Sequence, residues 1–92
     1  TGGTAHAVPD EVIIESMQML AETEGIFTET AGGVTIGVLR ALAQEGTIKP
    51  DELTVAYITG NGLKTQEVVE SVVNPITIEP DFSAFEEALK GL

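Results

Sequence analysis

Two glycine-containing turns carry the side chains of this chain that could take part in chemistry. The first lies in IFTETAGGVTIG at 26–37, where Glu29 precedes an Ala-Gly-Gly sequence, and the second lies in TVAYITGNGLK at 54–64, where Thr59 places a hydroxyl at the mouth of the turn. Glycines let a flat ligand approach the backbone closely, although they also serve simply to make tight turns. We therefore predict part of a cofactor site formed by these two turns.

The other groups expected of a complete site are absent from the sequence. There is no GxGxxG or GxxxxGK[ST] phosphate-binding loop. A Schiff-base lysine needs a desolvated pocket, whereas Lys64 follows a glycine turn and precedes polar residues, so we expect it to be solvent-facing or structural. His6 has no HxxxH or HxE partner, and no metal site is predicted. We predict no catalytic residue within the 92 residues.

Composition excludes several classes of partner. Fifteen acidic residues against four basic ones give a net charge of −11, which repels nucleic acids and anionic membranes. The absence of cysteine rules out disulfides and thiol chemistry within the chain. No apolar run approaches the roughly 20 residues needed to span a bilayer, and no signal peptide is recognisable, so a cytoplasmic location is expected. A chain that opens on Thr1 without Met is expected to be a fragment or a processed product.

The first predicted helix covers 10–23. Its apolar residues Ile13, Met17 and Leu20 fall at positions i, i+4 and i+7, which places them on one face of a helix. Gly25 is expected to end this helix, because glycine readily adopts the left-handed conformation found beyond helix C-termini.

The middle of the chain predicts a strand, a helix and a second strand. After a short strand at 26–29, the Ala-Gly-Gly turn is expected to lead into a helix with Val34, Val38 and Leu42 on a broad apolar face, ended by Gly46. Leu53 to Thr59 is a nearly continuous apolar run, which is typical of a parallel strand covered on both faces.

The remaining segments complete an α/β pattern. An extended segment is expected at 3–8, a weak helix at 64–73, another extended segment at 76–79 and a helix at 81–90 capped by its first residue. This order, βαβαβ with a tail, predicts one α/β segment over 1–92, built as part of a layered, mostly parallel sheet with flanking helices. Both glycine turns would then lie at the carboxyl ends of strands, where ligands gather in such sheets.

The stretch GIFTETAGGVTIGVLRALAQEGTIKPDELTVAYITGNGLKTQEVV resembles the C-terminal part of threonine synthase. It combines E-x-A-G-G opening a helix, the connection Lys49-Pro50-Asp51, and T-G-N-G-L-K after an apolar run. The resemblance extends over the whole chain. It implies a pyridoxal 5′-phosphate (PLP) enzyme of fold type II, the tryptophan-synthase β-like fold, with this chain as the C-terminal portion of the large domain.

The resemblance also implies a reaction and a set of residues. The family converts O-phospho-L-homoserine and water into L-threonine and phosphate. Thr59 is expected to hydrogen-bond the pyridine nitrogen of PLP, and Glu29, Ala31 and Gly32 are expected close to the ring. The cofactor lysine, the phosphate loop and the substrate-binding basic residues should lie upstream of Thr1. Partners are then the remainder of the enzyme chain and a small amino-acid phosphate, and a homodimer is compatible with the resemblance.

Two alternatives stay open. Another PLP enzyme of the same fold, such as a threonine dehydratase-like one, shares an E-P-A-G element, although T-G-N-G-L-K favours threonine synthase. A non-catalytic acidic domain that binds or regulates a partner would fit the small size, the charge and the missing catalytic groups.

Overall fold

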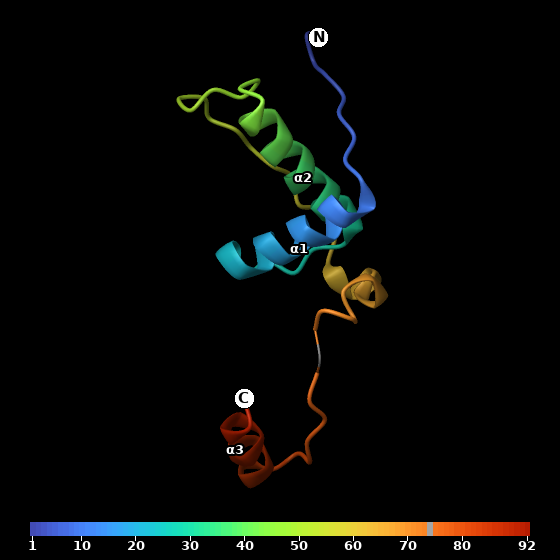
Figure 1. The fold of residues 1–92 in the computed structure, drawn as a ribbon, viewed down its shortest axis with the longest axis vertical. Helices are drawn as coiled ribbons and strands as arrows, with labels where there is room; N and C mark the ends of the chain where they lie inside the picture. Colours follow the sequence, from blue (N-terminus) through green and yellow to red (C-terminus); the bar gives the residue numbers. More distant parts are fainter. Residues whose placement is uncertain (74) are drawn as a thin grey trace.

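Two helices of 15 residues each, α1 (Asp10–Glu24) and α2 (Thr30–Gln44), pack against each other at the centre of the protein (Figure 1). A computed structural model describes residues 1–73 and 75–92. After α2 the chain turns back and enters two 3₁₀ helices, η1 (Gly62–Lys64) and η2 (Gln66–Val68). A last helix, α3 (Phe82–Lys90), stands apart from the other elements (Figure 1).

Helix α1 forms where its sequence pattern predicts. Asp10 is its first helical residue, and Pro9 takes the N-cap position in an extended conformation. An acidic residue in the first turn stabilises the helix through its attraction to the positive end of the helix dipole. Gly25 ends the helix with φ 68°, and its N–H donates to the carbonyl of Ala21 at 3.0 Å. The predicted glycine end is confirmed, and Met17 is buried.

Helix α2 begins earlier than predicted, and its glycines have a different role. It starts at Thr30, so the Ala-Gly-Gly sequence lies inside its first turn. A Cβ on Gly33 would lie 2.7 Å from the carbonyl oxygen of Ile13 in α1, so the absence of a side chain allows the two helices to approach closely. The buried residues of α2 are its glycines, whereas Val34 remains 36% exposed. Gly46, with φ 74°, follows the C-cap as predicted.

The predicted parallel sheet is wrong, and with it the α/β fold class. Residues 1–73 and 75–92 form helices and irregular segments without any β-strand, and strand-like pairing is limited to one isolated antiparallel bridge between Thr28 and Asn61. The segment at 26–29 cannot extend this bridge because α2 begins immediately after it. In the run at 53–59, Leu53 is 95% exposed and Tyr57 is 79% exposed. Apolar residues of this kind favour extended backbone, but a strand also needs a hydrogen-bonding neighbour.

The C-terminal third of the chain agrees in part with the elements predicted from the sequence. Instead of a helix over 64–73, the chain forms η1, η2 and turns. Helix α3 is confirmed with its cap, since the side chain of Asp81 accepts a hydrogen bond from Ala84 N–H at 3.0 Å. Within the described part of the chain, no helix has the length and apolar character needed to cross a lipid bilayer.

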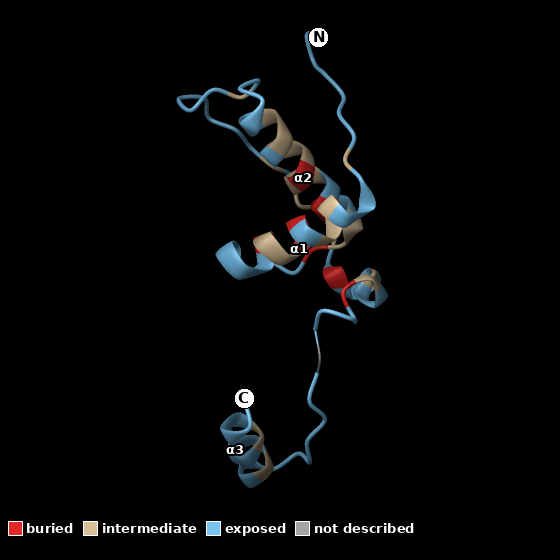
Figure 2. Cartoon of the chain, in the orientation of Figure 1, coloured by how far each residue is buried: buried red, intermediate tan, exposed pale blue. Residues whose placement is uncertain are grey.

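The hydrophobic core is small and lies where α1 meets its neighbours (Figure 2). Its buried apolar side chains are Met17, Leu20 and Val69. The radius of gyration is 17.1 Å, whereas a compact domain of this length has a radius of about 12 Å. Much apolar surface therefore stays uncovered, including Phe82 and Phe85 on α3.

Candidate functional site

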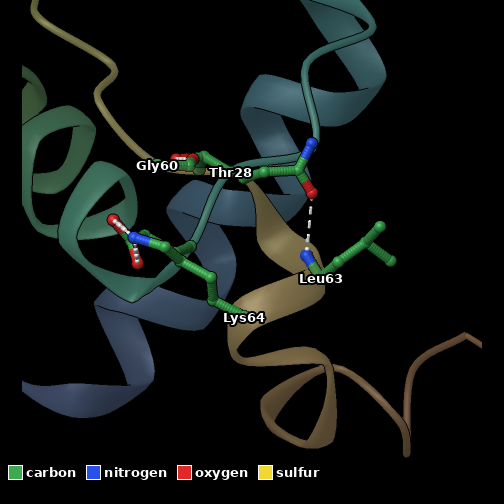
Figure 3. Close-up of polar contacts among 6 residues, drawn as sticks. Thr28, Gly60, Leu63 and Lys64 are labelled. Atoms are coloured by element: carbon green, nitrogen blue, oxygen red, sulfur yellow. Dashed lines mark hydrogen bonds and ion pairs between the residues drawn. The ribbon is translucent and has the colours of Figure 1, made fainter.

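The two glycine-containing segments, 26–37 and 54–64, meet in the structure where residues 27–29 lead into α2 and residues 60–62 lead into η1. The N–H of Glu29 donates to the carbonyl of Gly60 at 3.2 Å, and the N–H of Gly62 donates to the carbonyl of Phe27 at 3.1 Å. These two hydrogen bonds flank the bridge between Thr28 and Asn61. The turn that opens α2 and the turn that opens η1 are thus held together by backbone contacts, and they form one site from segments far apart in the sequence (Figure 3).

Thr28 lies at the centre of this contact. It is completely buried, and its hydroxyl donates a hydrogen bond to the carbonyl of Gly60 at 3.2 Å. Its Cβ also fills the space beside Gly32, where an added side chain would lie 2.8 Å away. Gly32 therefore accommodates Thr28 in this structure.

Glu29 and Lys64 form an ion pair across the same contact (Figure 3). The Lys64 Nζ lies 3.2 Å from Oε2 and 3.3 Å from Oε1 of Glu29. The Glu29 side chain is only 18% exposed, whereas that of Lys64 is 65% exposed. A Cβ on Gly60 would collide with the Glu29 carboxylate, so the absence of a side chain at Gly60 leaves room for this carboxylate. The prediction that Lys64 is solvent-facing or structural is confirmed.

Asn61 and Gly62 shape the start of η1. The Asn61 Oδ1 accepts a hydrogen bond from Leu63 N–H at 2.9 Å, which satisfies a backbone donor at the beginning of the 3₁₀ helix (Figure 3). A side chain on Gly62 would collide with the Phe27 ring. Each glycine of the G-N-G sequence thus removes a clash with the turn that precedes α2.

The predicted site residues occupy two positions relative to this contact. Glu29 and Gly32 lie within it, whereas Ala31 and Thr59 are exposed next to it. Thr59 directly precedes Gly60, so the backbone bonds of Gly60 to the other turn determine where Thr59 lies. Thr59 is exposed, and a threonine hydroxyl can both donate and accept a hydrogen bond.

Two shallow apolar pockets lie near the contact. One of about 550 Å³ is lined by Phe27, Leu63 and Val69 among others, and one of about 540 Å³ is lined by Ile13, Ala31 and neighbouring residues. Ala31 alone of the predicted site residues borders one of them. Glu29, Gly32 and Thr59 line neither of these two pockets.

His6 lies outside the contact. Its Nε2 is 3.8 Å from the Glu45 carboxylate, near the end of α2. Across residues 1–73 and 75–92, no three His, Asp or Glu side chains are grouped to hold a metal ion.

Sequence reasoning missed Thr28 and Asn61, which hold the site together. Thr28 reads in the sequence as an ordinary residue of a short strand, and nothing local shows that it will face Gly60. Asn61 carries a weak signal, because asparagine between two glycines is typical of a turn that ends in a helical N-cap. Its partner Leu63 is two residues away, so this hydrogen bond could have been anticipated.

Comparison with known proteins confirms the resemblance stated from the sequence. No family model matches the chain. It is 42% identical to the threonine synthase of Methanocaldococcus jannaschii over its whole length, and 38% identical to that of Halalkalibacterium halodurans over 99% of the chain. The threonine synthase of Methanosarcina acetivorans is 37% identical over 99% of the chain.

These relatives are much longer than this chain. The match covers 23% of the M. jannaschii protein, 26% of the H. halodurans protein and 23% of the M. acetivorans protein. Similar matches to threonine synthases of Bacillus and Synechocystis, each 30% identical, also cover about a quarter of those proteins. The chain is thus similar, along its full length, to one quarter-length portion of threonine synthases.

Proposed function

We propose that this chain is the C-terminal portion of a threonine synthase that uses PLP to convert O-phospho-L-homoserine and water into L-threonine and phosphate. The observation that carries the proposal is the union of the E-x-A-G-G and T-G-N-G-L-K turns, which share backbone hydrogen bonds and an ion pair. The whole-length similarity to threonine synthases supports it, since all of the relatives named above carry that name.

In this proposal Thr59 donates its hydroxyl hydrogen to the pyridine nitrogen of PLP. Bound PLP supplies an electron sink for carbanion chemistry, and the protein tunes that sink through the partner of the ring nitrogen. A neutral hydroxyl does not enforce protonation of this nitrogen as a carboxylate would. Ala31, exposed beside a shallow apolar pocket, is suited to contact a flat ring.

We propose that Glu29 and Gly32 lie near the ring and hold in place the turn that carries Thr59. Glu29 is fixed by Gly60 and Lys64, and Gly32 gives room to the buried Thr28. We place no catalytic residue in this chain. The cofactor lysine, the phosphate loop and the basic groups for substrate phosphate belong in this proposal to the remainder of the enzyme chain. A homodimer and a cytoplasmic location stay predictions.

A segment exchange tests the proposed function. The matching portion of the M. jannaschii threonine synthase would be replaced by these 92 residues, since that pair is 42% identical over the whole chain. We expect this hybrid to bind PLP, as measured by visible absorbance, and to release phosphate from O-phospho-L-homoserine. The same host without the segment is the control and should do neither. A folded hybrid that binds no PLP would overturn the proposal.

A further inference from the structure

We propose that Lys64 is a positioning residue, whose ion pair with Glu29 fixes the turn that carries Thr59. The inference rests on the proposed function, because it takes Thr59 as the residue that meets the cofactor ring. The sequence alone gives Lys64 no partner, since Glu29 lies 35 residues earlier in the chain. The structure brings the two side chains into contact across the meeting point of the two turns.

The Glu29–Lys64 pair differs from the other ion pairs of the described residues. The carboxylates of the other three, Glu15, Glu45 and Glu87, are each more than half exposed, and such pairs contribute little because water screens them. The Glu29 side chain is 18% exposed, and both of its oxygens lie within 3.3 Å of one ammonium. A carboxylate this far removed from water needs a compensating charge, so loss of the Lys64 ammonium should destabilise this contact.

The pair acts at the position that determines where Thr59 lies. Glu29 contacts Gly60 through its backbone N–H, and its side chain packs where a Cβ of Gly60 would be. If the ammonium is removed, the carboxylate must turn toward water, and the space it leaves loosens the contact with Gly60. Thr59 is the residue directly before Gly60, so its hydroxyl would lose its fixed position.

The ammonium has a second effect on the electrostatics of the site. The proposed cofactor and substrate both carry phosphate, and the chain has a net charge of −11. An uncompensated Glu29 carboxylate would repel such ligands at close range. With Lys64 in place, this part of the site carries no unpaired charge from Glu29.

The experiment compares Lys64→Met, Lys64→Arg and Lys90→Met in the hybrid enzyme. Lys64→Met removes the charge and keeps most of the apolar stem, while Lys64→Arg retains the charge. Lys90→Met is the matched control, because Lys90 also lies 3.2 Å from a carboxylate, that of Glu87, but within one exposed helix. Two quantities are measured: amide hydrogen exchange of peptides covering 27–30 and 59–64 without cofactor, and kcat and KM with cofactor.

We expect Lys64→Met to speed exchange at Glu29 and Gly62 by about fivefold, as a loss on the scale of one partly buried ion pair predicts. The kcat value should fall by a similar factor, and Lys64→Arg should restore most of both quantities. Lys90→Met should change neither. Unchanged exchange and kcat in Lys64→Met would overturn the inference while an active hybrid leaves the proposed function standing. An inactive hybrid would contradict the proposed function. The exchange data would still decide whether Lys64 holds the turn.

Discussion

The hydroxyl of Thr28 and the carbonyl oxygen of Gly60 lie 3.2 Å apart and join residues that are 32 positions apart in the sequence. This hydrogen bond is made by a completely buried side chain. It belongs to the contact that holds the opening of α2 against the opening of η1. The geometry of the proposed site therefore depends on residues that need not touch a ligand themselves.

Replacing Thr28 by valine tests this hydrogen bond. Valine keeps the shape of threonine, so the packing against Gly32 is preserved while the donor is lost. Gly60 still accepts from Glu29 N–H, so its carbonyl is not orphaned, and we expect a loss of about 1 kcal/mol in the free energy of unfolding. Urea unfolding followed by circular dichroism would measure it. The control is Thr23→Val, whose exposed hydroxyl bonds only within α1 and should matter less.

Two glycines of α2 should respond differently to alanine. At Gly33 the new methyl would lie 2.7 Å from the backbone oxygen of Ile13, which cannot move without shifting α1, so we expect a loss of about 1–3 kcal/mol. At Gly37 the nearest atoms are side-chain atoms at 3.2–3.3 Å. Better helix propensity there should offset the crowding, since alanine exceeds glycine by about 1 kcal/mol. Equal destabilisation by both substitutions would contradict this view of the helix contact.

Ser16→Ala is expected to leave stability unchanged or raise it. Ser16 is fully buried on α1, and its hydroxyl has no hydrogen-bond partner among the described residues. Removing an unsatisfied polar atom and adding helix propensity should together contribute roughly 0.5–1 kcal/mol. Thermal unfolding beside Ser83→Ala, an exposed serine of α3, separates burial from propensity. A marked loss at position 16 would mean that the hydroxyl makes a bond in solution.

Thr59→Val tests the proposed contact with the cofactor. In the hybrid enzyme this substitution leaves the ring nitrogen without a donor, at a cost of about 1–3 kcal/mol. Turnover should fall by about 10- to 100-fold on that scale. Steady-state kinetics and the absorbance of the bound cofactor would be recorded together, with Thr54→Val as an exposed control on the same segment. If turnover and absorbance both match the parent hybrid, Thr59 does not contact the ring.

Local signals in the sequence predict α1 and α3, but the helix expected over 64–73 is replaced by two short 3₁₀ helices and turns. The spacing of Ile13, Met17 and Leu20 predicts α1, and Gly25, Gly46 and Asp81 mark helix boundaries, because caps and amphipathic faces depend on residues a few positions apart. The sequence places the beginning of α2 too late, because glycine is a poor helix former and favours turns. In fact both glycines lie within the helix, where Thr28 leaves no room for a side chain at Gly32 and α1 leaves none at Gly33.

Local signals in the sequence do not decide whether a β-sheet forms. Val55 and Tyr57 belong to residue types that are enriched in strands, yet both are exposed and lie in no strand. Strand formation depends on a distant neighbour, which the pattern of one segment does not reveal. The same limit applies to Thr28 and Lys64, whose partners lie more than 30 residues away. The two turns could be predicted as parts of a site, but not the contacts that fasten them.

The segment that returns from the end of α2 to Thr59 is longer than the distance it has to span. Helix α2 carries the chain about 22 Å away from Glu29 over its 15 residues. Residues 46–59 must cover the same distance on the way back, and fully extended they would reach about 46 Å. The surplus is taken up in the turns around Lys49 and Asp51. Insertions or deletions of a few residues at 47–52 should therefore leave Thr59 where it is, whereas a length change inside 60–62 would pull the two turns out of register.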